Sequence, residues 1–471
     1  MIALDGCRKR HEAALLGLSC GIVAVGIAYA WLLSFIQWAG YWSIAFYLSV
    51  VLYQALYFSL FGLTFFELKG RFGRGTAVLV SPFVWAFLEY LSSFGIFGIP
   101  ELLGHSEFNN PVFREAAPLL GVNFVSFLTV SFCSLIVLIA VKRGAGRKRG
   151  LALVVIFLAI VGASHFLKGR QDRVLLASRG NPVRLALIQP AIDRSWINDA
   201  ARHEDVHSRY LEATRGETSG TIDLIVWPED VFPDSGDRSS RWRYQLFNML
   251  GKSPVEILFG APLTAGEAEY NAAFLYSGEE LMASYQKERL FPFGEYIPAS
   301  MLMQPIGLFL PPKLRGAHYS PGVKTTPLGS KVGLIGASIC LESLYGDIAG
   351  RRVRDGAELL VNLTNDSWFM GSSAAEKHFF VGAMRALENG RYFVQSALYG
   401  VTGVVDPEGR VVARTGPEEV KTLEVTVYPI KMKTWFTRIG LWRFPIFALM
   451  TAIYLGISSL ATRRSRSVTR S

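Results

Sequence analysis

The longest uncharged segment of the chain constrains its fold most. Residues 13–66 contain no Asp, Glu, Lys or Arg, and these 54 positions are enough for two helical membrane crossings of about 20 residues each. Only 18% of the 471 residues are charged and 51% are hydrophobic, whereas an ordinary soluble domain has about 25% charged residues. The sequence therefore predicts a membrane protein, and it excludes a disordered chain, a collagen-like chain and a small disulfide scaffold.

Other apolar segments predict four more spans, at residues 76–94, 118–141, 150–167 and 444–462. The total is six, with five before a long polar region and one after it. The basic cluster followed by an apolar run near the amino terminus also resembles a signal peptide. Because uncharged sequence continues for another 36 residues after Ala30, we expect the first span to stay uncleaved.

Basic residues gather in four segments next to these spans. Residues 8–10, 69–74, 142–149 and 463–470 together carry 15 Lys and Arg. All four segments lie on one side if every span crosses, and the positive-inside rule makes that side the cytoplasm. Together with the acidic residues beside them, these four segments have a net charge of +12. The whole chain has a net charge of +10, so the rest of the chain has −2. The basic charge therefore indicates topology and predicts no nucleic-acid partner.

The polar region between the fifth and sixth spans is expected to be an α/β domain outside the cytoplasm. We predict a transmembrane helical region at 1–167, this domain at 168–438, and a last helix with a basic tail at 439–471. Short apolar runs predict strands at 183–189, 224–227, 255–260, 272–276, 332–339 and 359–363, with a hairpin over 393–405 and 411–414. Helical patterns fit 199–215, 239–250 and 373–389, and residues 170–181 are expected to be a tether. This alternation is typical of a layered sheet.

Reactive side chains follow three of the apolar runs in the domain: Glu229, then Lys287 with Glu295, then Cys340 with Glu342. Acyl transfer needs a thiol whose proton a carboxylate accepts, and a cation that stabilises the oxyanion. Taken singly, Glu229 could be a turn residue, Lys287 a solvated lysine and Cys340 an inert buried cysteine. Their conjunction at strand ends favours an active site.

The segments around these residues resemble a known family. They are VWPE (226–229), YQKERLFPFGEYIP (285–298), ICLE (339–342), NLTNDSWF (362–369), MRALENGR (384–391) and GVTGVVDPEGRV (400–411), with EYL, LLGHSEFNNP and LLGVNFVSFL in the membrane part. The sequence resembles the nitrilase (carbon-nitrogen hydrolase) superfamily, and more closely its apolipoprotein N-acyltransferase branch of the bacterial inner membrane. The resemblance covers nearly the whole chain.

The resemblance implies a nitrilase-like αββα sandwich, inserted between transmembrane helices and facing the periplasm, with the basic loops and the carboxyl terminus in the cytoplasm. It implies Glu229 as general base, Lys287 as oxyanion stabiliser and Cys340 as nucleophile.

Further roles follow from the same resemblance. Glu295 would be an auxiliary carboxylate, Glu342 would support the nucleophile loop, and the backbone N–H of Leu341 would add to the oxyanion hole. Trp368 and Phe369 would border the substrate pocket.

The reaction implied is a ping-pong transfer of an acyl group from a phospholipid, through a Cys340 thioester, to the amine of a lipid-modified protein. No cofactor and no metal is expected. The chain departs from the family's usual pattern in having about two spans fewer, Asp230 after the Trp-Pro-Glu, Leu341 in place of Tyr, and Leu398-Tyr399 before Gly400. These departures leave open a shortened conjugal-transfer paralogue of unknown substrate, a membrane-tethered amidase, and a catalytically silent envelope scaffold.

Overall fold

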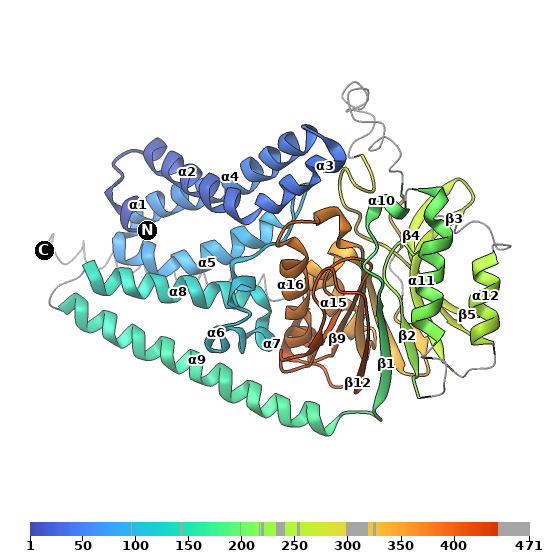
Figure 1. The fold of residues 1–471 in the computed structure, drawn as a ribbon. Helices are drawn as coiled ribbons and strands as arrows, with labels where there is room; N and C mark the ends of the chain where they lie inside the picture. Colours follow the sequence, from blue (N-terminus) through green and yellow to red (C-terminus); the bar gives the residue numbers. More distant parts are fainter. Residues whose placement is uncertain are drawn as a thin grey trace, which may run out of the picture. The chain divides into compact units, whose positions relative to one another are not determined.

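A computed structural model describes residues 1–95, 97–141, 145–197, 199–215, 217, 221–231, 241–251, 255–297, 319–323 and 326–440. Two compact units contain these residues. The helical unit includes Met1–Ala30 and Ile44–Arg170, and the sandwich unit consists of Trp31–Ser43 and Gln171–Arg438. Each unit is described by itself below (Figure 1).

Long apolar helices make up most of the helical unit. They are α2 (Arg10–Ala28), α4 (Trp42–Phe72), α5 (Arg74–Ser92), α8 (Val122–Val141) and α9 (Ala145–Ala177). All five are long and apolar enough to cross a membrane, which confirms the five spans predicted before the domain. The predicted sixth span, 444–462, lies outside the described residues. The chain is therefore a membrane protein.

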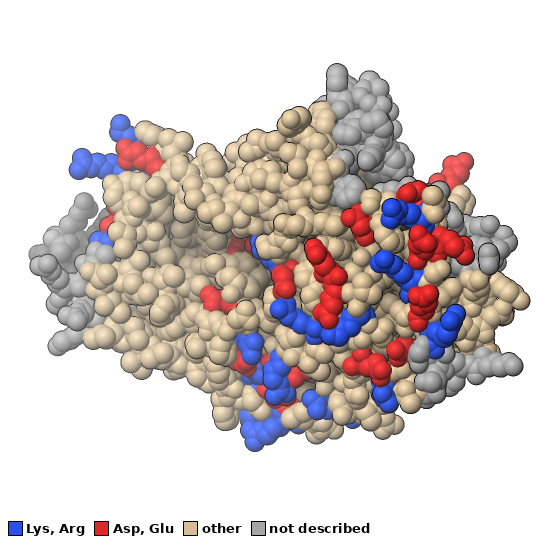
Figure 2. All heavy atoms as spheres, viewed as in Figure 1, with Lys and Arg blue, Asp and Glu red and all other residues tan. Residues whose placement is uncertain are grey.

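Small residues let the first two spans pack closely. A Cβ atom added to Gly17 of α2 would lie 2.3 Å from the carbonyl oxygen of Phe58, and one added to Gly62 of α4 would lie 2.3 Å from that of Ala13. Helices in lipid gain little from burying apolar side chains against each other, so close backbone contact supplies the attraction. The opposite faces of these helices expose large apolar side chains such as Ile22, and few charged side chains interrupt the surface of this unit in Figure 2.

The connector between α5 and α8 is more regular than a plain loop. It contains η2 (Leu103–Glu107), α6 (Pro111–Arg114) and α7 (Ala117–Leu120). Glu89 of α5 accepts a hydrogen bond from the backbone N–H of Leu103 at 2.7 Å. Glu115 forms a 2.8 Å ion pair with Lys168 of α9. These two carboxylates fix the connector to two of the spans.

Two six-stranded sheets form the sandwich unit. The first has the order β12-β1-β2-β3-β4-β5 and the second β11-β10-β9-β8-β7-β6. In the first sheet the strands are β1 (Val183–Gln189), β2 (Leu224–Val226), β3 (Glu256–Ala265), β4 (Ala268–Ser277), β5 (Glu280–Gln286) and β12 (Lys421–Val427). In the second they are β6 (Leu328–Ser330), β7 (Gly333–Ile339), β8 (Leu359–Thr364), β9 (Phe393–Ala397), β10 (Gly403–Val405) and β11 (Val411–Arg414). β1, β2 and β3 are parallel, as are β7, β8 and β9.

Helices cover the outer face of each sheet. α11 (His203–Arg215) and α12 (Arg241–Leu250) pack on the first sheet, where Tyr210 and Leu246 share a core with Trp227 and Ile257. α15 (Gly346–Arg354) and α16 (Ala374–Asn389) lie along the second sheet (Figure 1). Ser396 of β9 donates to the carbonyl oxygen of Ile188 in β1 at 3.1 Å, so the two sheets face each other. This arrangement confirms the predicted αββα sandwich.

Three local expectations were wrong in part. The run 393–405 folds as two strands, β9 and β10, because Gly400 turns the chain with φ +132° against the side chain of Asp366. The expected tether 170–181 is helical as far as Ala177, since Leu175 is buried against Gly390. Strands β5, β6 and β12 and helix α15 were not predicted; β6 has only three residues and α15 only nine.

Candidate active site

The predicted reactive residues follow the ends of strands in both sheets. Glu229 comes three residues after β2, Lys287 directly after β5, and Cys340 directly after β7. The carboxyl ends of parallel strands lie at one edge of a sheet, where the rigid strands fix side chains that the loops leave accessible. The sandwich brings the ends of its two sheets together, and so places these groups in one buried cluster.

Lys287 lies at the centre of this cluster. Its ammonium Nζ is 2.9 Å from the carboxylate of Glu295 and 3.6 Å from Oε1 of Glu229, and its side chain is 1% exposed. Burial by itself opposes the charged form, but Glu295 and Glu229 outweigh it and hold the pKa of Lys287 above its usual range. Lys287 therefore remains a cation at neutral pH.

Glu229 accepts hydrogen bonds from two donors and is buried. Its Oε1 accepts from the side-chain amide of Asn271 at 2.7 Å, and its Oε2 accepts from the backbone N–H of Asn365 at 2.9 Å. Burial is the largest influence and raises the pKa of Glu229 to about 7, although Lys287 and the Asn271 amide act in the opposite direction. A carboxylate with this pKa can accept and return a proton near neutral pH.

Cys340 begins the short 3₁₀ helix η5 (Cys340–Leu344) in a left-handed conformation, with φ +53°. Such a conformation is uncommon for a residue with a side chain and is often found at functional sites. Burial and the charge of Glu229 raise the pKa of the Cys340 thiol, while the ammonium of Lys287 lowers it. The resting thiol is therefore protonated, and a base must take its proton before sulfur can attack a carbonyl.

Glu342 joins the loop after β5 to the turn after β7. Its carboxylate accepts from the hydroxyl of Tyr285 and from the backbone N–H groups of Glu288, Arg289 and Ile339, at 2.7 to 3.0 Å. Burial raises its pKa, although Lys287 and these donors favour its ionised form. Glu342 thus holds the two segments that carry Lys287 and Cys340.

Asn271 of β4 is a site residue that the sequence did not indicate. Its side-chain amide donates to Glu229 and to Glu295, both at 2.7 Å, and so bridges the two carboxylates around Lys287. The backbone N–H of Phe291 holds the other oxygen of Glu295 at 2.7 Å. Asn271 precedes Ala272, which pairs with Gln286, and this register places it beside Lys287, whose backbone N–H donates to the carbonyl oxygen of Asn271 at 2.8 Å.

Aromatic side chains lie beside the loops that hold these groups. Trp368 and Phe369 belong to η6 (Asp366–Phe369), and Phe35 lies 5.9 Å and 5.3 Å from their rings. Phe35 also stacks on Phe291 at 5.8 Å, and Trp31 contacts Phe369 edge-on at 5.0 Å. The segment between the first two spans therefore contributes to this aromatic cluster in the sandwich unit.

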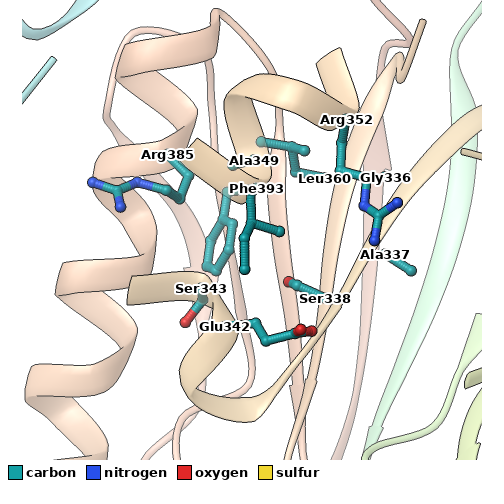
Figure 3. Close-up of a pocket in the computed structure, with 11 residues that line it drawn as sticks. Gly336, Ala337, Ser338, Glu342, Ser343, Ala349, Arg352, Leu360, Arg385 and Phe393 are labelled. Carbon is teal, nitrogen blue, oxygen red and sulfur yellow. The ribbon is translucent and has the colours of Figure 1, made fainter. Parts of the chain in front are cut away.

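A small cavity lies behind the nucleophile turn (Figure 3). Ser338, Glu342 and Ser343 line it, together with Arg352 from α15 and Phe393 from β9. The space open to a water centre is about 10 Å³, which fits one water molecule. This cavity is too small for a substrate.

Two known protein-family models match this chain. Residues 184–435, more than half of the chain, match the carbon-nitrogen hydrolase family model. The chain belongs to the carbon-nitrogen hydrolase family. Residues 1–135 match the apolipoprotein N-acyltransferase N-terminal domain, which places this carbon-nitrogen hydrolase in the branch that carries that domain and confirms the resemblance seen in the sequence.

Three relatives of this carbon-nitrogen hydrolase share the name apolipoprotein N-acyltransferase, and each is 29% identical to it. The match to the Geobacter metallireducens protein covers 72% of this chain and 66% of the relative, just under two thirds of its length. The match to the Haemophilus ducreyi protein covers 92% and 86%, and the match to the Methylococcus capsulatus protein covers 97% and 89%.

Catalytic roles for the site residues of this carbon-nitrogen hydrolase stay predictions, although the structure brings Glu229, Lys287 and Glu295 into contact. No group of three or more His, Cys, Asp or Glu side chains among the described residues could hold a metal ion. The expectation that the reaction needs neither metal nor cofactor also stays a prediction.

Proposed function

We propose that this chain is a membrane-bound N-acyltransferase that moves a fatty acyl group from a phospholipid, through a thioester on Cys340, to the terminal amine of a lipid-modified protein. The proposal rests mainly on the buried ammonium of Lys287. This ammonium lies between Glu229 and Glu295 and interacts electrostatically with Cys340. The relatives that bear the name of this activity support it.

In the first half-reaction, Glu229 accepts the Cys340 proton while sulfur attacks the carbonyl carbon of the phospholipid ester. The oxyanion that forms is stabilised by the ammonium of Lys287 and by the backbone N–H of Leu341. When the oxyanion collapses, the C–O bond breaks and the alkoxide of the lysophospholipid takes the proton from Glu229. The product on the enzyme is a thioester, and Glu229 is again ionised.

In the second half-reaction, a neutral amine attacks the thioester carbonyl and gives a proton to Glu229. The C–S bond breaks, and the sulfur of Cys340 recovers that proton from Glu229. Lys287 keeps its proton throughout, since its pKa lies above the usual range. Its part is electrostatic, because a cation placed beforehand needs no reorganisation when the oxyanion forms.

A membrane location suits this chemistry. Extracting an acyl chain from the bilayer costs about 0.8 kcal/mol for each CH₂ group exposed to water. The spans would keep the site at the surface where both lipid-linked substrates reside. We place the chain in the bacterial inner membrane, with the domain 168–438 in the periplasm and the basic loops of the region 1–167 and the tail of 439–471 in the cytoplasm, from the distribution of Lys and Arg.

The aromatic cluster around Phe35 fits an acyl-chain pocket. Trp368 and Phe369 would form one wall, and the segment Trp31–Ser43 would form another. This segment joins two spans, so a lipid could pass from the bilayer to the site along its aromatic side chains.

Mass spectrometry of the purified protein after incubation with a phospholipid tests the proposal. We expect an acyl adduct on the Cys340 peptide that hydroxylamine removes, and no adduct in Cys340→Ala. Cys7→Ala, at an intermediate surface position in the helical unit, is the matched control and should acylate normally. An acyl adduct elsewhere with Cys340 unmodified would reject the assignment.

The molecule that accepts the acyl group distinguishes the acyltransferase from the other proposed functions. Transfer to a diacylglyceryl-peptide amine supports the acyltransferase, whereas release of free fatty acid or ammonia by water would indicate a hydrolase or amidase. Lipoprotein maturation that persists in cells carrying only Cys340→Ala would indicate a scaffold.

A further inference from the structure

A buried histidine that the proposed reaction does not use lies behind the nucleophile turn. His378 of α16 is 4% exposed. Its Nδ1 is 2.8 Å from Oδ1 of Asp366, and its Nε2 is 3.2 Å from the carbonyl oxygen of Cys340 and 2.9 Å from the hydroxyl of Ser343. The ring thus connects the nucleophile residue to a buried carboxylate.

The protonation state of the ring decides which of these contacts are hydrogen bonds donated by His378. A carboxylate and a carbonyl oxygen can only accept hydrogen bonds, so both ring nitrogens must carry hydrogen if both contacts are hydrogen bonds. Burial disfavours the charged imidazolium, but Asp366 outweighs this effect and raises the pKa of His378. The backbone carbonyl of Cys340 and the charge of Glu229 act in the same direction as Asp366. The raised pKa favours the form with hydrogen on both ring nitrogens, in which Nδ1 donates to Asp366 and Nε2 donates to the carbonyl oxygen of Cys340.

The carbonyl that His378 holds belongs to the same peptide unit as the N–H of Leu341. A trans peptide is planar, and its C=O and N–H point in opposite directions. Fixing the Cys340 oxygen towards α16 therefore aims the Leu341 N–H away from α16. The peptide between Ser338 and Ile339, two units earlier, is fixed as well, because Glu342 accepts from the N–H of Ile339 at 2.9 Å.

We propose that His378 is a positioning residue that sets the direction of the Leu341 N–H by donating to the carbonyl oxygen of Cys340. A charged donor on the carbonyl also polarises the peptide and strengthens its N–H as a donor. The inference rests on the proposed function, since the N–H acts only if an oxyanion forms on a carbonyl attacked by Cys340.

Asp366 extends this arrangement towards the base. Its carboxylate also accepts from the hydroxyl of Thr364 at 3.0 Å, and its backbone N–H donates to Tyr399 at 2.9 Å. The preceding residue, Asn365, donates its N–H to Glu229. The His378–Asp366 pair therefore joins the peptide that follows the nucleophile to the loop that binds the general base.

Two substitutions separate the two contacts of the ring. The amide nitrogen of Gln is as many bonds from Cα as Nε2 of His, whereas that of Asn is as many as Nδ1. His378→Gln can therefore keep a donor to Cys340, and His378→Asn can keep one only to Asp366. Melting temperatures of both variants in detergent would show that they fold.

Two probes of Cys340 distinguish positioning from general disruption. Acylation by p-nitrophenyl butyrate passes through an oxyanion, whereas alkylation by iodoacetamide displaces iodide from carbon and forms none. Both rates can be read on the Cys340 peptide by mass spectrometry in the full-length protein. We expect His378→Asn to acylate at least about tenfold more slowly and His378→Gln within about threefold of wild type, with alkylation nearly unchanged in both.

Equal acylation rates in the two variants, or alkylation that falls in step with acylation, would overturn the inference. Acylation of the wild type by the butyrate ester but not by phospholipid would reject the proposed substrate and leave the role of His378 intact. A wild-type Cys340 that neither ester nor phospholipid acylates would overturn both proposals.

Discussion

Lys287→Met tests the electrostatic basis of the site most directly. The substitution keeps an unbranched side chain of similar length but removes the ammonium that lies 3.6 Å from Glu229 and 2.9 Å from Glu295. Two unit charges 3.6 Å apart attract by about 5 kcal/mol at an effective dielectric constant of about 20. Loss of that attraction strongly favours the protonated form of Glu229.

Two effects on acylation follow from this loss. Losing an oxyanion donor reduces the rate by about 10²- to 10³-fold. The pKa of Glu229, about 7 in the wild type, should rise further. Because the base must be ionised to accept the Cys340 proton, wild-type acylation should increase as pH rises through about 7, and the increase in Lys287→Met should occur at higher pH.

Single-turnover acylation between pH 5.5 and 9.5, followed by mass spectrometry of the Cys340 peptide, measures both effects. Lys421→Met is the matched control, since Lys421 pairs with Glu419 on the surface with 44% of its side chain exposed. It should leave both rate and pH profile unchanged. A Lys287→Met variant with lower rate but an unmoved pH profile would refute the proposed coupling to Glu229, and an unaltered rate would refute the oxyanion role.

Three further predictions concern the surroundings of the triad. Asn271→Leu removes the amide that bridges Glu229 and Glu295, and should slow single-turnover acylation by about ten- to a hundredfold, or about 1.4 to 3 kcal/mol. Phe35→Ala removes three ring contacts, and should raise KM for a long-chain phospholipid about tenfold with little change in kcat in a steady-state assay. Glu342→Gln replaces an acceptor of three backbone N–H groups, and should cost about 3 kcal/mol of stability, seen as a lower melting temperature in detergent.

Surface residues of the same types provide the controls. Tyr244→Ala on α12, 70% exposed, should leave KM unchanged, and Glu376→Gln, paired with Arg414 at the surface, should leave the melting temperature unchanged. Normal acylation by Asn271→Leu would show that the carboxylates need no bridge. A Phe35→Ala effect confined to kcat would contradict a part in lipid binding.

Most regular elements were predictable because their sequences carry strong periodic signals. The uncharged run 13–66 predicted two spans, and the apolar runs at β1, β7 and β8 predicted buried strands that the structure confirms. Strand β12 was not predicted, although its Leu423, Val425 and Val427 are buried and alternate with polar residues, the pattern of a half-buried strand. It pairs with β1 at one edge of the first sheet.

Some site residues could be predicted from the sequence, and others were found only in the structure. Glu229 and Cys340 each follow an apolar run, and Lys287 lies in the segment YQKERLFPFGEYIP that carries the family resemblance, so local sequence was enough to select them as candidates. Asn271 and His378 lie within a strand and a helix, where a polar residue usually has only a structural part. Neither has a local signal, because their partners are 42 and 38 residues away along the chain.

Five membrane spans, the α/β class of the domain and the candidate reactive side chains could be predicted from the sequence, because hydrophobic periodicity and reactive groups are local properties of the chain. The folded chain was needed to find that Lys287 lies between two carboxylates, that Phe35 from the segment between two spans contacts Trp368 and Phe369, and that His378 contacts the carbonyl of Cys340. These contacts depend on how strands pair and sheets stack, and burial then sets the charges that each group keeps.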